Sequence, residues 1–230
     1  MTPSQPYMGL PCSLAYDRSA VPAPQRLHSA RLYLVCAARP RAWLDAVLRG
    51  GVDVVQLRDK SLDDDGIVAA ARAFRAAADT AGALFILNDR PDLVAVCGAD
   101  GVHVGQDDMS PGRARERVGA DLIVGRSTHS PAQAAQAEAD PDVDYLAVGP
   151  VHATPTKPGR PATGLGFIAH AAETVSKPWF AIGGLNAGNV HETLAHGATR
   201  IVVVRAIADA ADPEAAARTL RAALGAPVGA

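Results

Sequence analysis

The chain has 230 residues, of which 48% are hydrophobic and 20% are charged, a composition typical of one globular domain with a sizeable buried core. Its 22 Lys and Arg residues are balanced by 24 Asp and Glu residues. It therefore lacks the basic surplus that nucleic-acid or anionic-membrane binding usually requires, and any phosphate recognition must be local.

The cysteines and the apolar runs indicate the cellular compartment of the protein. Cys12, Cys36 and Cys97 are widely separated, with no pair at metal-ligand or redox spacing, and their odd number argues against a disulfide framework. No apolar run approaches the roughly 20 residues that a bilayer span requires, and the N-terminus lacks a basic start followed by an apolar stretch. We expect a cytoplasmic protein that binds neither membranes nor nucleic acid.

Residues 1–30 differ in pattern from the rest of the chain. They contain five prolines among small, polar and charged residues, without the periodicity of a helix or a strand. We predict a disordered N-terminal tail over residues 1–30 and a single domain over residues 31–225.

From residue 31 onward, short apolar runs alternate with longer stretches rich in Ala, Leu and Arg. The apolar runs cover residues 32–36, 52–56, 84–87, 101–104, 122–124, 145–148, 179–182 and 201–204. Because they are almost continuously apolar, they indicate parallel strands that are buried on both faces. Ser110-Pro111, Ser130-Pro131 and Asp212-Pro213 are typical helix starts between such strands. The alternation predicts an α/β fold, a TIM (β/α)8 barrel, with an open doubly wound sheet as the alternative.

In such a barrel the carboxyl ends of successive strands meet on one face, and acidic residues follow two neighbouring strands. Asn88-Asp89 follows the third strand and Asp107-Asp108 follows the fourth. Two adjacent loops can offer carboxylates to Mg²⁺, which takes one or two of them together with phosphate oxygens. Asp and Asn are also common turn and capping residues, which is the alternative interpretation of each loop.

Basic residues follow the second strand. If that strand continues, the side chains of Gln56, Arg58 and Lys60 point to the same side. An Arg fork and a Lys point charge suit an anionic substrate group, although a solvated strand end is an equally simple explanation. Lys157 follows the sixth strand and would lie at the same end of the barrel, where the carboxyl ends of the strands meet.

The later strands end in residues suited to phosphate groups. Thr154 and Thr156 offer hydroxyls before a long Gly- and Pro-rich loop, and Gly183-Gly184 follows the seventh strand, where barrels often bind phosphate. Ser127 at the end of the fifth strand could also reach a phosphate. No feature marks an activated nucleophile of a Ser-His-Asp triad, and His129 is either an acid/base or a polar neighbour.

In order along the chain, several motifs together closely resemble the thiamine-phosphate synthase family. They are Gln56-Leu57-Arg58-Asp59-Lys60, Asn88-Asp89, the run from Gly101 to Asp108, the run from Gly125 to His129, the run from Gly149 to Lys157, and Ile182-Gly183-Gly184. The resemblance extends from about Arg31 to Ala211. Two departures are Ala153, where the family often has proline, and Arg205, where it often has serine.

The resemblance implies a TIM barrel that joins 4-amino-2-methyl-5-hydroxymethylpyrimidine diphosphate to a thiazole ethyl phosphate. The products would be thiamine monophosphate and diphosphate, and a carboxylated thiazole would also lose CO₂. By resemblance, the pyrimidine diphosphate would be bound by Gln56, Leu57, Arg58, Asp59, Lys60, Asn88, Ser127 and Lys157. Asp89 and Asp108 would hold Mg²⁺, and the thiazole phosphate would be bound by Thr154, Thr156, Gly184, Val204 and Arg205.

The implied mechanism is a Mg²⁺-assisted dissociative substitution, in which Arg58, Lys60, Lys157 and Ser127 would take catalytic roles. Cations would stabilise the departing diphosphate, and the thiazole nitrogen would attack a carbocation at the exocyclic methylene. Two alternatives stay open: a thiazole tautomerase of the same superfamily, which would use His129, and a non-catalytic barrel that binds thiamine phosphate. The sequence also leaves open whether the protein is a homo-oligomer.

Overall fold

The computed structural model describes residues 21–154 and 161–225, and within these ranges eight parallel strands form a closed barrel in sequence order. The strands are β1 (Leu32–Cys36), β2 (Val54–Leu57), β3 (Leu84–Asn88), β4 (Gly101–Val104), β5 (Ile123–Thr128), β6 (Tyr145–Val148), β7 (Trp179–Ile182) and β8 (Ile201–Val203). The barrel closes between β1 and β8, where Leu34 pairs with Val203. The TIM barrel is therefore confirmed, and the open doubly wound sheet is excluded.

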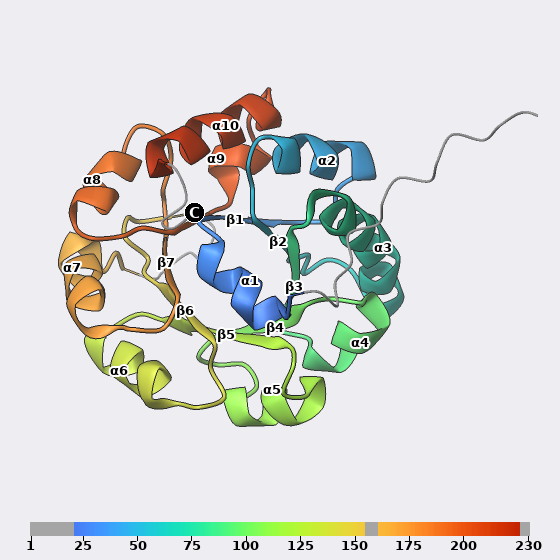
Figure 1. The fold of residues 1–230 in the computed structure, drawn as a ribbon, viewed down its shortest axis with the longest axis horizontal. Coiled ribbons are helices and arrows are strands. Elements are labelled where there is room, and N and C mark those ends of the chain that lie inside the picture. Colours follow the sequence, from blue (N-terminus) through green and yellow to red (C-terminus); the bar gives the residue numbers. More distant parts are fainter. Residues whose placement is uncertain (1–20, 155–160, 226–230) are drawn as a thin grey trace, which may run out of the picture.

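Helices follow the strands and form the outer ring of the barrel (Figure 1). They are α2 (Arg41–Arg49), α3 (Asp64–Ala81), α4 (Val94–Cys97), α5 (Pro111–Val118), α6 (Pro131–Ala139), α7 (Gly164–Thr174), α8 (Val190–Ala195), α9 (Arg205–Ala208) and α10 (Pro213–Leu224), with a 3₁₀ turn at Pro91–Leu93 before α4. In the part of the chain that the structure describes, no helix has both the length and the apolar character that a membrane crossing requires.

The predicted helix starts are present. Helices α5, α6 and α10 begin at Pro111, Pro131 and Pro213. The hydroxyl of Ser130 accepts a hydrogen bond from the backbone N–H of Gln133 at 3.3 Å, and Asp212 does the same for Ala215 at 2.9 Å. These caps satisfy N–H groups that have no partner within the helix, so local sequence fixes where α6 and α10 begin. Ser110 makes no side-chain cap hydrogen bond, and α5 begins at Pro111 without one.

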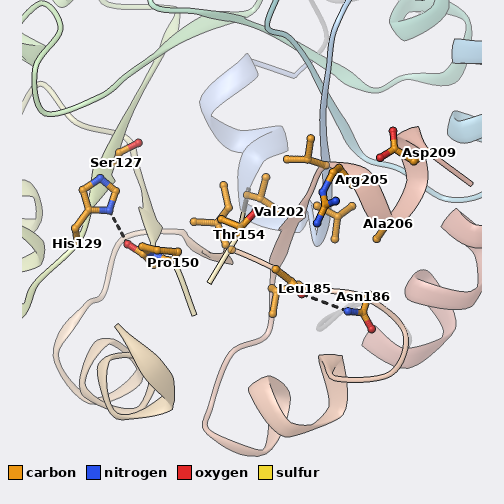
Figure 2. A pocket seen from close by; sticks show the side chains of 16 residues that line it. Ser127, His129, Pro150, Thr154, Leu185, Asn186, Val202, Arg205, Ala206 and Asp209 are labelled. Atoms are coloured by element: carbon orange, nitrogen blue, oxygen red, sulfur yellow. Dashed lines mark hydrogen bonds between the residues drawn. The ribbon is translucent and has the colours of Figure 1, made fainter. Parts of the chain in front are cut away.

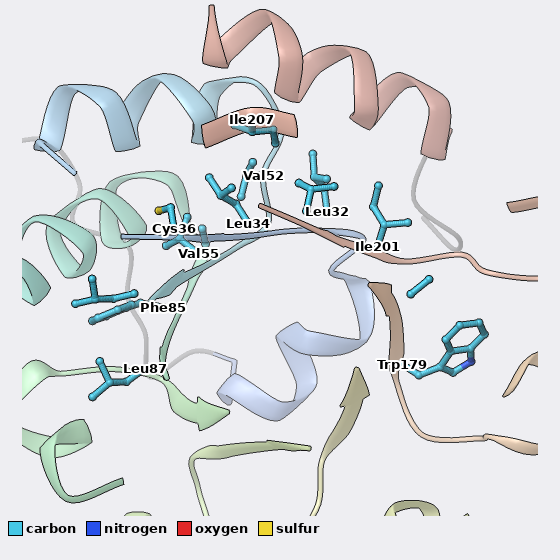
Figure 3. Close-up of a cluster of buried hydrophobic side chains, with 14 of the residues drawn as sticks. Leu32, Leu34, Cys36, Val52, Val55, Phe85, Leu87, Trp179, Ile201 and Ile207 are labelled. Atoms are coloured by element: carbon cyan, nitrogen blue, oxygen red, sulfur yellow. The ribbon is translucent and has the colours of Figure 1, made fainter. Parts of the chain in front are cut away.

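The larger hydrophobic core lies between the strands and the surrounding helices. Alternate residues of β1, among them Leu32 and Leu34, point outward into it, and Ile207 of α9 packs on the same layer (Figure 3). Further round the barrel, in the same outer core, Phe85 of β3 meets Phe74 of α3 with ring centroids 5.5 Å apart. This layer fixes the strands against the helices and thereby fixes the loops at the barrel mouth.

A second, smaller core fills the inside of the barrel, where Tyr33, Tyr145 and Phe180 are among its largest buried side chains. A short helix, α1 (Ala23–Ser29), lies across the barrel axis in Figure 1 and adds Leu27, which is only 1% exposed, to this core. Arg26 of the same helix binds Asp100, which precedes β4, at 3.1 Å. Helix α1 thus closes the N-terminal end of the barrel.

The prediction that the whole of residues 1–30 is a disordered tail is wrong for residues 23–29. Helix α1 is too short for a helical period to stand out after a run of prolines, and its stability comes from burial rather than from its own sequence. The rest of that prediction, residues 1–20, lies outside the described residues.

Candidate active site

At the carboxyl end of the strands, a narrow cavity of about 60 Å³ opens along the barrel axis. Its polar lining comes from Tyr33, Gln56, Arg58, Asn88, His103 and Ser127, and its apolar walls from Val35, Ala147, Ile182, Val202 and Val204. The structure therefore brings together four of the residues expected to bind the pyrimidine diphosphate, namely Gln56, Arg58, Asn88 and Ser127.

A wider pocket of about 370 Å³ adjoins this cavity and shares four residues with it: Ser127, Ile182, Val202 and Val204. Ser127 and His129 lie on one side of the pocket, and Arg205 of α9 and Asp209, which follows that helix, lie on the other, with Thr154 between them (Figure 2). Gly184 belongs to the same lining. The residues predicted for the thiazole phosphate that the structure describes (Thr154, Gly184, Val204 and Arg205) thus share one pocket.

The glycine pair after β7 is required by close packing of two loops. A Cβ on Gly183 would lie 2.5 Å from the Cα of Pro150, and a Cβ on Gly184 would lie 2.8 Å from the Cβ of His152. Gly184 also has a φ of +67°, which favours glycine. Packing alone accounts for both glycines, so phosphate binding at Gly184 stays a prediction.

Asp89 and Asp108, the predicted metal ligands, lie together at the mouth. Burial, followed by the nearby Asp108 carboxylate, raises the pKa of Asp89 above its usual value, while Asn88 and Lys60 act in the opposite direction. Asp89 has a φ of +60°, which places it in the left-handed region. Asp108 accepts a hydrogen bond from the N–H of Gly105 at 2.9 Å. Two carboxylates and one lysine therefore form a single cluster beside the cavity.

This cluster suits a hard divalent cation. Across residues 21–154 and 161–225, no group of three or more His, Cys, Asp or Glu side chains is arranged to hold a metal. Mg²⁺ does not need such a group, since one or two carboxylates with water and substrate oxygens are enough. Asp89 and Asp108 are the residues that would hold it.

The motif from Gln56 to Lys60 begins in the last two residues of β2, and not every residue of it points into the cavity. The strand ends at Leu57, whose side chain is buried in the outer core. Asp59 accepts hydrogen bonds from Ser61 and from the backbone of Ala38, and the Ser61 bonds lower its pKa. The strand does not continue through the motif, so the condition under which Gln56, Arg58 and Lys60 would all point to the same side is not met. Gln56 and Arg58 line the cavity, Asp59 holds the loop by its hydrogen bonds, and Lys60 is an exposed turn residue beside Asp89.

Two predicted substrate residues, Thr156 and Lys157, lie outside the described residues, and their roles stay predictions. His129, the acid/base candidate of the tautomerase alternative, donates from its Nδ1 to the carbonyl of Gly149 at 2.5 Å, as drawn in Figure 2. That bond orients the ring at the pocket wall.

The sequence interpretation missed Tyr33 and Tyr145, which it treated only as strand residues. Both are buried inside the barrel, and their hydroxyl oxygens lie 2.9 Å apart. A tyrosine in an otherwise aliphatic buried strand was the available signal, because a buried phenol usually finds a hydrogen-bond partner.

Comparisons with known proteins agree with this geometry. The family model described as "Thiamine monophosphate synthase" matches residues 32–207. The thiamine-phosphate synthase of Thermus thermophilus is 53% identical over 199 residues, which cover 83% of this chain and 95% of the relative. That of Acidothermus cellulolyticus is 50% identical over 206 residues, covering 87% of this chain and 97% of the relative.

A solved structure extends the likeness to the fold. The thiamine phosphate pyrophosphorylase of Pyrococcus furiosus superposes with a TM-score of 0.79 at 30% identity, covering 87% of this chain and 97% of the other. The extent of these matches, over the whole barrel and its mouth, means that the chain belongs to the thiamine monophosphate synthase family.

Proposed function

We propose that the protein is a thiamine-phosphate synthase, a transferase of an alkyl group other than methyl. It condenses 4-amino-2-methyl-5-hydroxymethylpyrimidine diphosphate with a thiazole ethyl phosphate, or its carboxylated form, and releases thiamine monophosphate and diphosphate. The carboxylated thiazole also loses CO₂. Both described cysteines, Cys36 and Cys97, are free thiols, which supports a location in the reducing cytoplasm.

The observation that carries the proposal is the Asp89–Asp108 pair, with Lys60 beside it, at the mouth of a cavity lined by Arg58 and Asn88. This set provides both carboxylates for a cation and positive charge for an anionic leaving group. Bound Mg²⁺ would neutralise charge that develops on the departing diphosphate. Asp89 and Asp108 would hold the ion and Asn88 would contact the substrate next to it.

The remaining chemistry falls to the residues of the protein. Arg58, Lys60 and Lys157 stabilise the negative charge of the leaving diphosphate, because preorganised cations stabilise charge without reorganising at the moment of reaction. Ser127, at the junction of the narrow cavity and the wider pocket, contacts the pyrimidine substrate. No covalent enzyme intermediate is needed, because the thiazole nitrogen itself attacks the methylene carbon.

The two adjoining cavities support a division of the substrates. The narrow cavity has apolar walls and polar ends, which suit a flat pyrimidine ring, and the wider pocket takes the thiazole with its phosphate near Thr154, Gly184 and Arg205. Holding the two reactants side by side supplies part of the rate enhancement, since alignment converts a bimolecular reaction into an effectively unimolecular one.

A thiazole tautomerase is the alternative enzyme, and His129 does line the wider pocket. An isomerase that acts on one thiazole phosphate does not need the paired carboxylates of Asp89 and Asp108 or several cations for a diphosphate. The presence of these residues favours the transferase. A non-catalytic barrel would bind thiamine phosphate without forming it.

The decisive experiment measures diphosphate release and thiamine monophosphate formation from the two substrates, with Mg²⁺ and with a chelator. We expect equal amounts of both products, and only with the metal. If folded protein binds the thiazole phosphate but yields neither product, the transferase proposal is wrong. Conversion of the thiazole isomer alone would then identify the tautomerase.

A further inference from the structure

A chain of buried hydrogen bonds crosses the inside of the barrel and ends at Ser127. The amide Nε2 of Gln56 lies 2.6 Å from the hydroxyl of Tyr33, which lies 2.9 Å from the hydroxyl of Tyr145. Tyr145 lies 2.9 Å from Nδ1 of His103, and Nε2 of His103 lies 2.9 Å from the hydroxyl of Ser127. Five strands of the barrel each contribute one member.

This hydrogen-bond chain has one direction. The Gln56 amide nitrogen can only donate, so the Tyr33 oxygen accepts from it. Among the described residues the buried Tyr33 hydroxyl has one other hydrogen-bond partner, Tyr145, and we therefore assign the Tyr33 proton to that bond, because the opposite direction would leave the proton without an acceptor in the protein. The Tyr145 proton then goes to Nδ1 of His103, which must be the unprotonated nitrogen of the neutral ring. The proton of that ring lies on Nε2, from which it is donated to Ser127.

Both phenols carry the protons that the hydrogen-bond chain requires. Burial raises the pKa of Tyr33 and that of Tyr145 well above the usual value for tyrosine. Each hydroxyl therefore has one proton to donate and lone pairs to accept with.

Packing holds the hydrogen-bond chain in place. The ring of Phe180 meets Tyr33 edge-on at a centroid distance of 5.4 Å and Tyr145 at 5.7 Å. Both tyrosines and Phe180 are at most 1% exposed, so the rings have no freedom to turn toward water. The direction of the hydrogen bonds is thus built into a rigid part of the barrel.

We propose that Tyr33, Tyr145 and His103 are positioning residues that act through Ser127. Because Ser127 accepts from His103, its own proton is left to be donated to a lone pair of the bound pyrimidine diphosphate. That lone pair belongs either to a ring nitrogen or to a diphosphate oxygen. The inference rests on the proposed function and deepens it, since it states why Ser127 must act as a donor at the place where the two cavities join.

A double-mutant cycle on the rate of thiamine monophosphate formation tests this coupling. Tyr145→Phe should lower kcat/KM about tenfold, as expected for the loss of one well-placed hydrogen bond. In a Ser127→Ala background the same change should cost less than about twofold. Additive losses in the double variant would contradict the proposal, because they would mean that Tyr145 acts on activity independently of Ser127.

Two further variants separate positioning from packing. His103→Gln keeps a nitrogen donor near the position of Nε2 and should retain more activity than His103→Leu. Thr193→Val removes a different buried hydroxyl, on α8 and outside the hydrogen-bond chain, and should leave kcat/KM unchanged. Equal activity of His103→Gln and His103→Leu would show that the donor at this position does not matter.

The tautomer of His103 can be read by ¹⁵N NMR of the whole protein without any turnover. We expect the proton on Nε2 in the wild type and a change of tautomer or protonation in Tyr145→Phe. A proton on Nδ1 in the wild type would overturn the direction of the hydrogen-bond chain. If the wild type makes no product, the proposed function fails, while this measurement still decides the direction.

Binding measurements distinguish the two acceptors. Hydroxymethylpyrimidine alone and inorganic diphosphate with Mg²⁺ are each titrated into wild type and Tyr145→Phe. Weaker binding of the pyrimidine assigns the acceptor to the ring, and weaker binding of diphosphate assigns it to the leaving group. Unchanged affinity for both would contradict the proposal that Tyr145 acts on substrate binding through Ser127.

Discussion

The ring of Tyr145 fills the space in which a side chain on Gly125 would lie. The two residues are register partners on β5 and β6, and a Cβ on Gly125 would overlap the Cζ, Cε1 and hydroxyl of Tyr145. Gly125 is therefore what lets Tyr145 reach across the barrel toward His103. A small residue on one strand fixes the position of a polar group from the next.

We expect Gly125→Ala to lower the free energy of unfolding by about 1–3 kcal/mol, the usual cost of overpacking a core, and to lower activity by displacing Tyr145. Urea unfolding and steady-state kinetics measure the two effects. The control is Gly166→Ala on α7, where a Cβ would meet no atom within 4 Å. That change should be neutral or stabilise by up to about 1 kcal/mol. Equal stability of the two variants would disprove the packing argument.

Leu27 tests the role of α1 at the other end of the barrel. It is 1% exposed, and we expect Leu27→Ala to cost about 2–5 kcal/mol in urea unfolding. Gln25→Ala, at an exposed position of the same helix, should change stability by less than about 0.5 kcal/mol. Because α1 closes the end opposite the active site, folded Leu27→Ala protein should keep its kcat. A large loss of kcat would mean that α1 influences the mouth.

The sequence predicted the barrel but not this helix, for a physical reason. Each strand is buried on both faces, so the burial pattern can be recognised within four or five residues. Helix α1 buries only Ala23 and Leu27 within its bounds, and a helix of two turns gives no period to detect. Only its contacts with the barrel interior stabilise it.

Asp89 and Asp108 could be predicted because strand order alone places their loops side by side. The hydrogen bonds between Tyr33, Tyr145 and His103 could not, because Tyr33 and Tyr145 are 112 residues apart. These side chains are in contact because they lie at the same height along the barrel axis, although their strands are far apart in the sequence. That height is set by the stagger of the strands in the closed barrel, which cannot be predicted from a local sequence pattern.

For the metal cluster, we expect Asp89→Asn to raise the Mg²⁺ concentration needed for half-maximal rate by at least about tenfold. Asparagine tolerates the positive φ of this position, so the backbone should keep its conformation. Asp107→Asn is the matched control, since Asp107 is exposed on the same loop as Asp108. An unchanged metal requirement in Asp89→Asn would remove Asp89 from the proposed site.

Glu138 provides a test of stability against pH. It lies near the end of α6 and accepts hydrogen bonds from the backbone N–H groups of Ser176 and Lys177, each at 3.2 Å, and from the Ser176 hydroxyl. Burial of Glu138 opposes its charge, but these hydrogen bonds outweigh the burial and lower its pKa below the usual 4.5.

A lowered pKa in the folded state means that the carboxylate stabilises the fold above the unfolded-state pKa, and that this stability is lost as the pH falls through the folded-state value. Glu138→Gln should therefore be less stable than wild type by up to about 1 kcal/mol near pH 7, since the site is partly exposed. The difference should disappear in acid. Ser176→Ala should lose part of the same dependence, and a difference that grows in acid would contradict the assignment.

Arg205 decides how the thiazole phosphate is held. It is exposed at the start of α9 and lines the wider pocket opposite Ser127. At the position of Arg205 the family often has serine. If its guanidinium binds the phosphate, Arg205→Ala should raise KM for the thiazole phosphate about tenfold, because charge-assisted hydrogen bonds to phosphate are among the strong ones. KM for the pyrimidine diphosphate should change less than about twofold, since we propose that this substrate binds in the other cavity. Arg218→Ala, an exposed arginine on α10, controls for the loss of surface charge. A thiazole KM equal to that of the control would place Arg205 at the rim only and leave the phosphate to Thr154 and the loop that contains Gly184.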